Sequence, residues 1–118
     1  MEFLNKIELR GVVGRADVNV FNSNYVCNFS VVTECSVLDK ERNTAIETTW
    51  FNVSAWNGVD GIEDLHALKK GMWVRVIGRL RVRKYVSQDN VERTSNDVLA
   101  RYVEIIPKDD FPMQVQRD

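Results

Sequence analysis

The sequence has 118 residues, of which 44% are hydrophobic and 28% charged, and its 16 Lys and Arg residues face 17 Asp and Glu residues. This length suits a single domain, and the apolar fraction is too high for a disordered chain. No stretch approaches the ~20 apolar residues of a membrane span, and the first residues do not resemble a signal peptide. We therefore expect a soluble cytoplasmic protein with no membrane partner. The balanced charge argues against a uniformly basic nucleic-acid binder, whose pI usually exceeds ~9.

The cysteines and the single histidine restrict the chemistry further. Cys27 and Cys35 lie eight residues apart, and the chain contains no C-x-x-C pair. His66 cannot complete a zinc site with them at any usual spacing. We therefore expect two buried free thiols, no metal and no cofactor. Glycine-rich phosphate loops and nucleophile motifs are also absent from the sequence, so it predicts a protein that is not an enzyme.

Strand patterns dominate the first part of the chain. Residues 6–10 alternate polar and apolar side chains, which is the period of a half-buried strand. Gly11 and Gly14 then indicate a bulge or a sharp bend. Residues 22–24 are predicted to form a turn and residues 25–33 a second strand.

One segment in the middle of the chain has helical spacing. A polar stretch at 37–47 is predicted to be a long hairpin loop, and a third strand is expected over 48–56. Apolar residues then recur at three-residue steps over 60–70, where Asp60 and Glu63 have the spacing of a capping box. We therefore predict a helix between the third and fourth strands.

Two further strands are predicted after this helix, over 72–86 and 98–105, with a polar turn at 87–90 between them. Five strands with a helix between the third and fourth are typical of an OB-fold. The predicted fold class is therefore all-β, a five-stranded Greek-key barrel with one helix. We expect the barrel to occupy residues 1–107, followed by a short flexible tail at 108–118.

The third strand has two faces of different character. Successive side chains of a strand point to opposite sides, so Val53 and Ala55 share an aliphatic face, whereas Trp50, Asn52 and Trp56 share the other. The aliphatic face suits the core, which places the tryptophans outside. Exposed large aromatics favour a ligand that stacks on them. The alternative is a different register, with both tryptophans in the core or at a subunit interface.

The fourth strand carries much of the positive charge. Seven basic residues and no acidic residue lie in 69–84, a segment that ends beside Tyr85. A solvated edge strand also favours Lys and Arg, but it would be expected to include some acids, so we favour a groove that follows phosphates. The even positions of this strand predict a core face of Val74, Val76, Gly78, Leu80 and Val82. The candidate phosphate or polar contacts are Asn52 on the third strand, Arg79, Arg81 and Arg83 on the fourth, and Arg10 at the end of the first.

Exposed aromatics beside a basic strand predict binding of single-stranded nucleic acid. Aromatic side chains stack bases at ~1–3 kcal/mol each, and a positive groove follows the flexible backbone. Such binding depends on salt and selects weakly for sequence, because every base has a π-face. No basic amphipathic recognition helix is predicted, which disfavours duplex binding.

Five blocks of the sequence resemble the bacterial single-stranded DNA-binding protein family. They lie in order within about residues 4–106, at 5–11, 28–33, 49–53, 70–71 and 78–85. The resemblance implies an OB-fold that assembles, usually as a homotetramer with a dimer possible, and protects single-stranded DNA during replication, recombination and repair. It implies base stacking by Trp50, Trp56 and Tyr85. It implies basic contacts by Lys6, Lys70, Arg83 and Lys84.

The sequence also departs from the family pattern. Val37 stands where the family often has another stacking aromatic, and the segment after Gly14 is shorter than usual. The chain ends without the long linker and acidic tip that recruit replication and repair proteins, and residues 109–112 are only faintly similar to that tip. We therefore expect weaker or shorter binding and few partners. The alternatives are a primosome-type OB-fold accessory protein that acts through protein contacts, an RNA-binding OB module and an OB-fold enzyme fragment.

Overall fold

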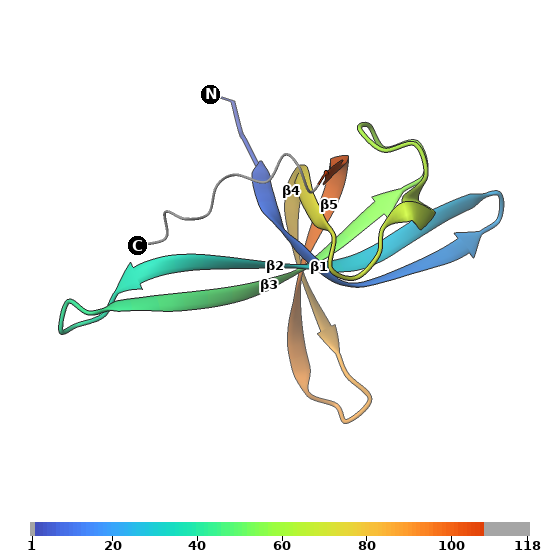
Figure 1. Ribbon diagram of the computed structural model, residues 1–118. Coiled ribbons are helices and arrows are strands. Elements are labelled where there is room, and N and C mark those ends of the chain that lie inside the picture. The colour runs from blue at the N-terminus through green and yellow to red at the C-terminus, as the bar shows by residue number, and fades with distance from the viewer. Residues whose placement is uncertain (1, 108–118) are drawn as a thin grey trace.

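Five long strands form a closed barrel in the computed structural model, which describes residues 2–107 (Figure 1). The predicted tail at 108–118 lies outside the described residues. In chain order the elements are β1 (Ile7–Phe21), β2 (Asn24–Leu38), β3 (Thr44–Trp56), the 3-10 turn η1 (Leu65–Ala67), β4 (Trp73–Val86) and β5 (Glu92–Ile106). Around the barrel the order is β1-β2-β3-β5-β4, as expected for an OB-fold. Within this range no helix is long and apolar enough to cross a membrane.

Strand β1 pairs with two neighbouring strands along its length. Its first half pairs with β4, from Ile7 opposite Gly78 onward, and its second half pairs with β2. The register with β2 shifts between Val13 and Arg15, so Gly14 is the extra residue of a bulge. The predicted bend is therefore confirmed, and it lets one strand contribute to both sides of the barrel.

The barrel closes through a short parallel contact between β3 and β5. Asn52, Val53 and Ser54 lie opposite Asp97, Val98 and Leu99, respectively. The remaining strand pairs are antiparallel and longer. This closure places the outward face of β3 directly beside Asp97 of β5.

Alternation along the strands separates core from surface as predicted for β3. Val53 and Ala55 are buried, as are Val74 and Val76 of β4. The predicted core face of β4 is nevertheless wrong beyond Gly78, because Leu80 and Val82 are exposed. At that point β4 leaves the barrel and continues into a hairpin arm with solvent on both faces (Figure 1).

Three hairpins extend from the barrel as arms, formed by β1–β2, β2–β3 and β4–β5 (Figure 1). The prediction of a long loop at 37–47 is wrong, because β2 and β3 remain paired as far as Leu38 opposite Thr44. The Asp39 carboxylate accepts hydrogen bonds from the amides of Glu41 and Asn43 and tightens the turn. Strand β5 likewise starts at Glu92, earlier than predicted. Backbone pairing in such arms does not need an apolar face, so hydrophobic patterning underestimates their length.

The helix predicted over 60–70 is not formed. Asp60 and Gly61 run beside β5: the Asp60 carbonyl accepts a hydrogen bond from the Val103 amide at 3.0 Å, and Gly61 has φ +92°. Extended pairing and a left-handed residue are incompatible with a helix start. Only η1 remains, capped by Asp64, and it buries Leu65 against the barrel.

The two cysteines occupy different environments. Cys27 is a buried free thiol, as predicted, and burial raises its pKa. Cys35 is also free but lies exposed on the β2–β3 arm, so the prediction of a second buried thiol is wrong. On a two-stranded arm neither face of the strand meets the core.

Candidate nucleic-acid interface

A groove of about 890 Å³ runs along the outside of the barrel. Strands β4 and β5 and the residues preceding β1 form much of its wall, and β2 and β3 contribute the rest together with Phe21. The groove brings together five of the residues predicted from the sequence: Lys6, Trp56, Arg79, Arg81 and Arg83. Segments that are distant in the sequence therefore meet here.

The N-terminal wall of the groove is held by one asparagine. The side-chain amide of Asn5 donates to the Leu80 carbonyl at 2.8 Å, and the Leu80 amide donates to Asn5 Oδ1 at 3.0 Å. The side chain thus imitates a strand residue and extends the contact between β1 and β4. This clamp places Lys6 at the groove beside the basic face of β4.

Both tryptophans of β3 are on the outside of the barrel, as their parity predicts. Trp50 is 61% exposed and Trp56 is 48% exposed. Trp50 lies over the bulge in β1: a Cβ atom added to Gly14 would be 2.4 Å from the indole and 2.8 Å from Ser30 Oγ. The absence of a side chain at Gly14 therefore provides the space that the Trp50 ring occupies.

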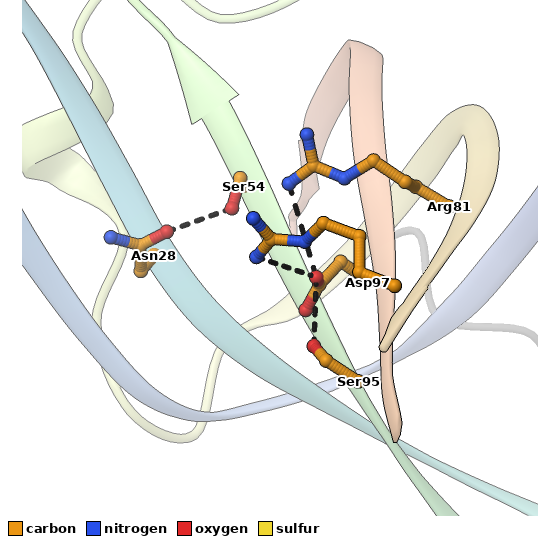
Figure 2. Close-up of polar contacts among 6 residues, drawn as sticks. Asn28, Ser54, Arg81, Ser95 and Asp97 are labelled. Carbon is orange, nitrogen blue, oxygen red and sulfur yellow. Dashed lines mark hydrogen bonds and ion pairs between the residues drawn. The ribbon is translucent and has the colours of Figure 1, made fainter. Parts of the chain in front are cut away.

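The arginines of β4 share a carboxylate on β5. Asp97 accepts from Arg83 at 3.4 Å, its contact with Arg81 is 3.9 Å, and Ser95 Oγ donates to it at 3.0 Å. Figure 2 shows the Asp97 carboxylate between Ser95 and the Arg81 guanidinium. The Asp97 side chain is only 17% exposed, whereas both arginines are more accessible. Two positive charges thus face the groove above one shielded negative charge.

Part of the groove lining is polar and uncharged. Ser54 Oγ donates to Asn28 Oδ1 at 2.8 Å and links β3 to β2 (Figure 2). Arg79, further along the groove, makes no ion pair with any residue in the described range. An extended anionic ligand would therefore meet both neutral hydrogen-bonding groups and guanidinium groups in this groove.

Other predicted contacts lie outside this groove. Tyr85 and Lys84 are exposed on the β4–β5 arm, where neither strand face is covered. Asn52 is exposed on the same face of β3 as the tryptophans. Lys70 precedes Gly71, whose amide donates to the Val13 carbonyl at 2.8 Å, so this basic loop is held beside the bulge in β1.

Arg10 belongs to a different surface. It lies opposite Arg75 on the paired strands β1 and β4. The Arg75 guanidinium contacts Glu8 at 2.8 Å and Glu104 at 3.7 Å, and it lies over the Tyr102 ring. The contact with Arg75 lowers the pKa of Glu8. Arg75, one of the seven cations in the basic segment, is thus engaged away from the groove.

Sequence reasoning missed several residues in and behind the groove, and the most important is Asp97, which pairs with the groove residues Arg81 and Arg83. A hairpin that turns at 88–90 places residue 97 opposite residue 81, so the strand register contained the signal. Asn28 and Phe21 also line the groove. Their positions depend on the β1–β2 pairing, which the sequence pattern did not specify.

The contact between Gly14 and Trp50 can be tested directly. We expect Gly14→Ala to displace the Trp50 indole and change the near-ultraviolet circular dichroism, while the protein stays folded because the close atoms belong to the side chains of Trp50 and Ser30 and not to the backbone. The same change in a Trp50→Ala background should have little further effect. Gly78→Ala is the comparator: its Cβ would be 2.2 Å from the Leu99 carbonyl oxygen, so overpacking should destabilise the fold by about 1–3 kcal/mol. An unchanged spectrum for Gly14→Ala would contradict the assignment.

The comparisons with solved structures agree with this architecture. A Plasmodium falciparum SSB in complex with ssDNA superposes with a TM-score of 0.74 at 23% identity, covering 91% of this chain and 98% of that one. A deletion mutant of the single-stranded DNA binding protein from Thermus aquaticus gives a TM-score of 0.72 at 17% identity, covering 89% of this chain and 51% of that one. These similarities establish the shared OB-fold.

Sequence comparison places the chain more closely. A single-stranded DNA-binding protein of Neisseria meningitidis serogroup A is 35% identical over 105 residues, and one of Xanthomonas campestris is 30% identical over the same length. Each match covers 87% of this chain and 60% of the relative, so the chain spans about 60% of the length of these curated relatives. The model of the single-strand binding protein family matches residues 4–106. The chain therefore belongs to the single-strand binding protein family.

Proposed function

We propose that this protein binds single-stranded DNA with little sequence preference and protects it during replication, recombination and repair. It acts by binding, without catalysis, in the cytoplasm of a bacterium. Bases stack on Trp50, Trp56 and Tyr85, while basic and polar side chains contact the backbone. The family membership and the names of its relatives support this proposal.

The observation that carries the proposal is the shared position of Trp56 and the β4 arginines on one groove. Trp56 offers an exposed ring, and Arg79, Arg81 and Arg83 line the same depression. Stacking needs a base with a free face, which an intact duplex does not offer along its length. The aromatic and basic groups together therefore favour an unpaired strand.

Titration with oligo-dT, followed by tryptophan fluorescence at two salt concentrations, tests this function. We expect strong quenching that weakens with salt, because stacking quenches the indoles and phosphate contacts release counterions. Trp50→Ala and Trp56→Ala should each weaken binding about tenfold with little loss of folding, since both rings are exposed. Val86→Ala, an exposed position on the β4–β5 arm, is the control and should bind like the wild type.

Three outcomes would contradict this reading. Duplex DNA that binds as tightly as oligo-dT would remove the argument for an unpaired strand. Tighter binding of oligo-rU would favour an RNA-binding module. No binding of any oligonucleotide by a folded protein would favour an accessory protein that works through protein contacts.

The shielded carboxylate of Asp97 gives a further test. Asp97→Asn removes the charge that Arg81 and Arg83 share, so both should become more available to phosphates. We expect tighter oligo-dT binding at low salt and a plot of log affinity against log salt that is steeper by about 0.7 to 1.4. Glu104→Gln is the matched control. Glu104 is on β5, as Asp97 is, but it pairs with Arg75 of β4, away from the groove. Weaker binding by Asp97→Asn would show instead that the carboxylate mainly holds the arginines in position.

We propose further that the chain assembles, as a homotetramer or a dimer. Residues 7–10 of β1 pair with β4, and within the described chain they pair with no other strand. Their free edge suits pairing with a second copy. The half-buried rings of Trp73 and Tyr102 belong to the neighbouring strands β4 and β5.

Light scattering after size-exclusion chromatography checks the assembly. We expect a mass of two or four chains at micromolar concentration. A monomer under these conditions would contradict the proposal without affecting the groove, whose described lining comes from one chain.

A further inference from the structure

Phe21 is an exposed aromatic residue that the proposed function does not use. It is the last residue of β1, at the β1–β2 hairpin, and 54% of its surface is exposed. Its ring centroid lies 6.0 Å from that of Trp56, and the two ring planes are inclined by 45°. Both rings line the groove.

The strand register places the two rings on one surface. Phe21 lies opposite Asn24, and two residues further along β2 the buried Val26 lies opposite Trp56. Directly opposed residues share a face of a sheet, and so do residues two apart on one strand. Phe21, Val26 and Trp56 therefore form one apolar surface across β1, β2 and β3.

Covering Val26 accounts for only part of the Phe21 side chain. Val26 is 4% exposed with Phe21 in place, yet 54% of the Phe21 residue remains open to solvent. An aromatic ring left half exposed beside another exposed ring in a basic groove is expected where a flat ligand binds. The groove contains arginines for the charge of such a ligand, and Phe21 contributes to its lining from the end of β1.

The spacing of the rings decides how a base can bind. Carbon atoms in contact lie about 3.5 Å apart, so a base inserted between two rings needs roughly 7 Å. The observed 6.0 Å excludes insertion. Successive bases can stack instead on the outer surfaces of the two rings, and the 45° inclination then requires them to turn relative to one another. An unpaired strand permits this turn, whereas the parallel stacking of a duplex does not.

We propose, on the basis of the proposed function, that Phe21 extends the binding site as a fourth stacking residue. It takes the nucleobase next to the one on Trp56, so the bound strand reaches the β1–β2 hairpin. Phe21 and Trp56 together form a bent platform that favours unpaired strands. The sequence-level assignment, in which Val37 leaves one stacking position empty, therefore undercounts the aromatic contacts.

Four variants at one position, measured with oligo-dT, test this assignment. Phe21→Ala and Phe21→Leu should both bind about fivefold to tenfold more weakly, because Leu restores the apolar cover but offers no π-face. Phe21→Tyr should bind like the wild type. Phe21→Trp should increase the fluorescence quenched on binding, because it adds an indole under a base. Thermal unfolding of each variant verifies the fold.

Val20→Ala is the matched control, since Val20 is the neighbouring residue, is 71% exposed and points to the other face of β1. It should leave the affinity unchanged. Wild-type affinity for Phe21→Ala, or full rescue by Phe21→Leu, would overturn the role of Phe21 while leaving the proposed function intact. Failure of the wild-type protein to bind oligo-dT would overturn both.

Discussion

The alternation of side chains along β3 is the constraint on which the rest of the molecule depends. One face of the strand provides Val53 and Ala55 for the core, and the other provides Trp50 and Trp56 for the surface. A slip of one residue would exchange the two sets, burying indoles where small side chains fit. The same register therefore specifies both the core and the exposed aromatic face. The parallel contact with β5 fixes this strand in place and brings Asp97 to its outward face.

Charge is organised by the same geometry. The full chain has a formal net charge of −1, yet the groove presents arginines. The local potential in a groove, more than the total charge, governs the attraction of a charged ligand. The negative charge of Asp97 lowers this positive potential. The Asp97 side chain is largely shielded from solvent, whereas Arg81 and Arg83 remain accessible. Under the proposed function, a groove with this lower positive potential depends more on stacking, so the number and inclination of the exposed rings determine the selectivity for unpaired strands.

The sequence predicted the features that depend on alternation and missed those that depend on long-range pairing. The outward position of Trp50 and Trp56 and the bulge at Gly14 followed from local patterns. The helix over 60–70 did not form, because Asp60 pairs with β5, a contact that no local pattern contains. The buried positions predicted at Leu80 and Val82 were wrong for a related reason: parity states which face a residue occupies, but not whether the strand still belongs to the barrel there.

Asp97 and Phe21 show the same distinction at the site. Phe21 lines the groove and Asp97 contacts its arginines only because their strands pair with neighbouring strands. The register of the β4–β5 hairpin was deducible from its polar turn, so Asp97 could have been found. The place of Phe21 beside Trp56 required the alignment of three strands at once, which a single sequence does not specify.

The three arms have a dynamic consequence. Their outer segments contain paired backbone but little buried apolar surface, and such regions open at a small fraction of the global unfolding free energy. Amides near the tips should therefore exchange with solvent far faster than those around Val53 and Val76. A nucleic-acid strand bound across the barrel and onto an arm would suppress this opening. The conformational entropy lost by the ordered arm would lower the affinity. The barrel would then determine where a ligand binds, and ordering of the arms would vary with the length of ligand that contacts them.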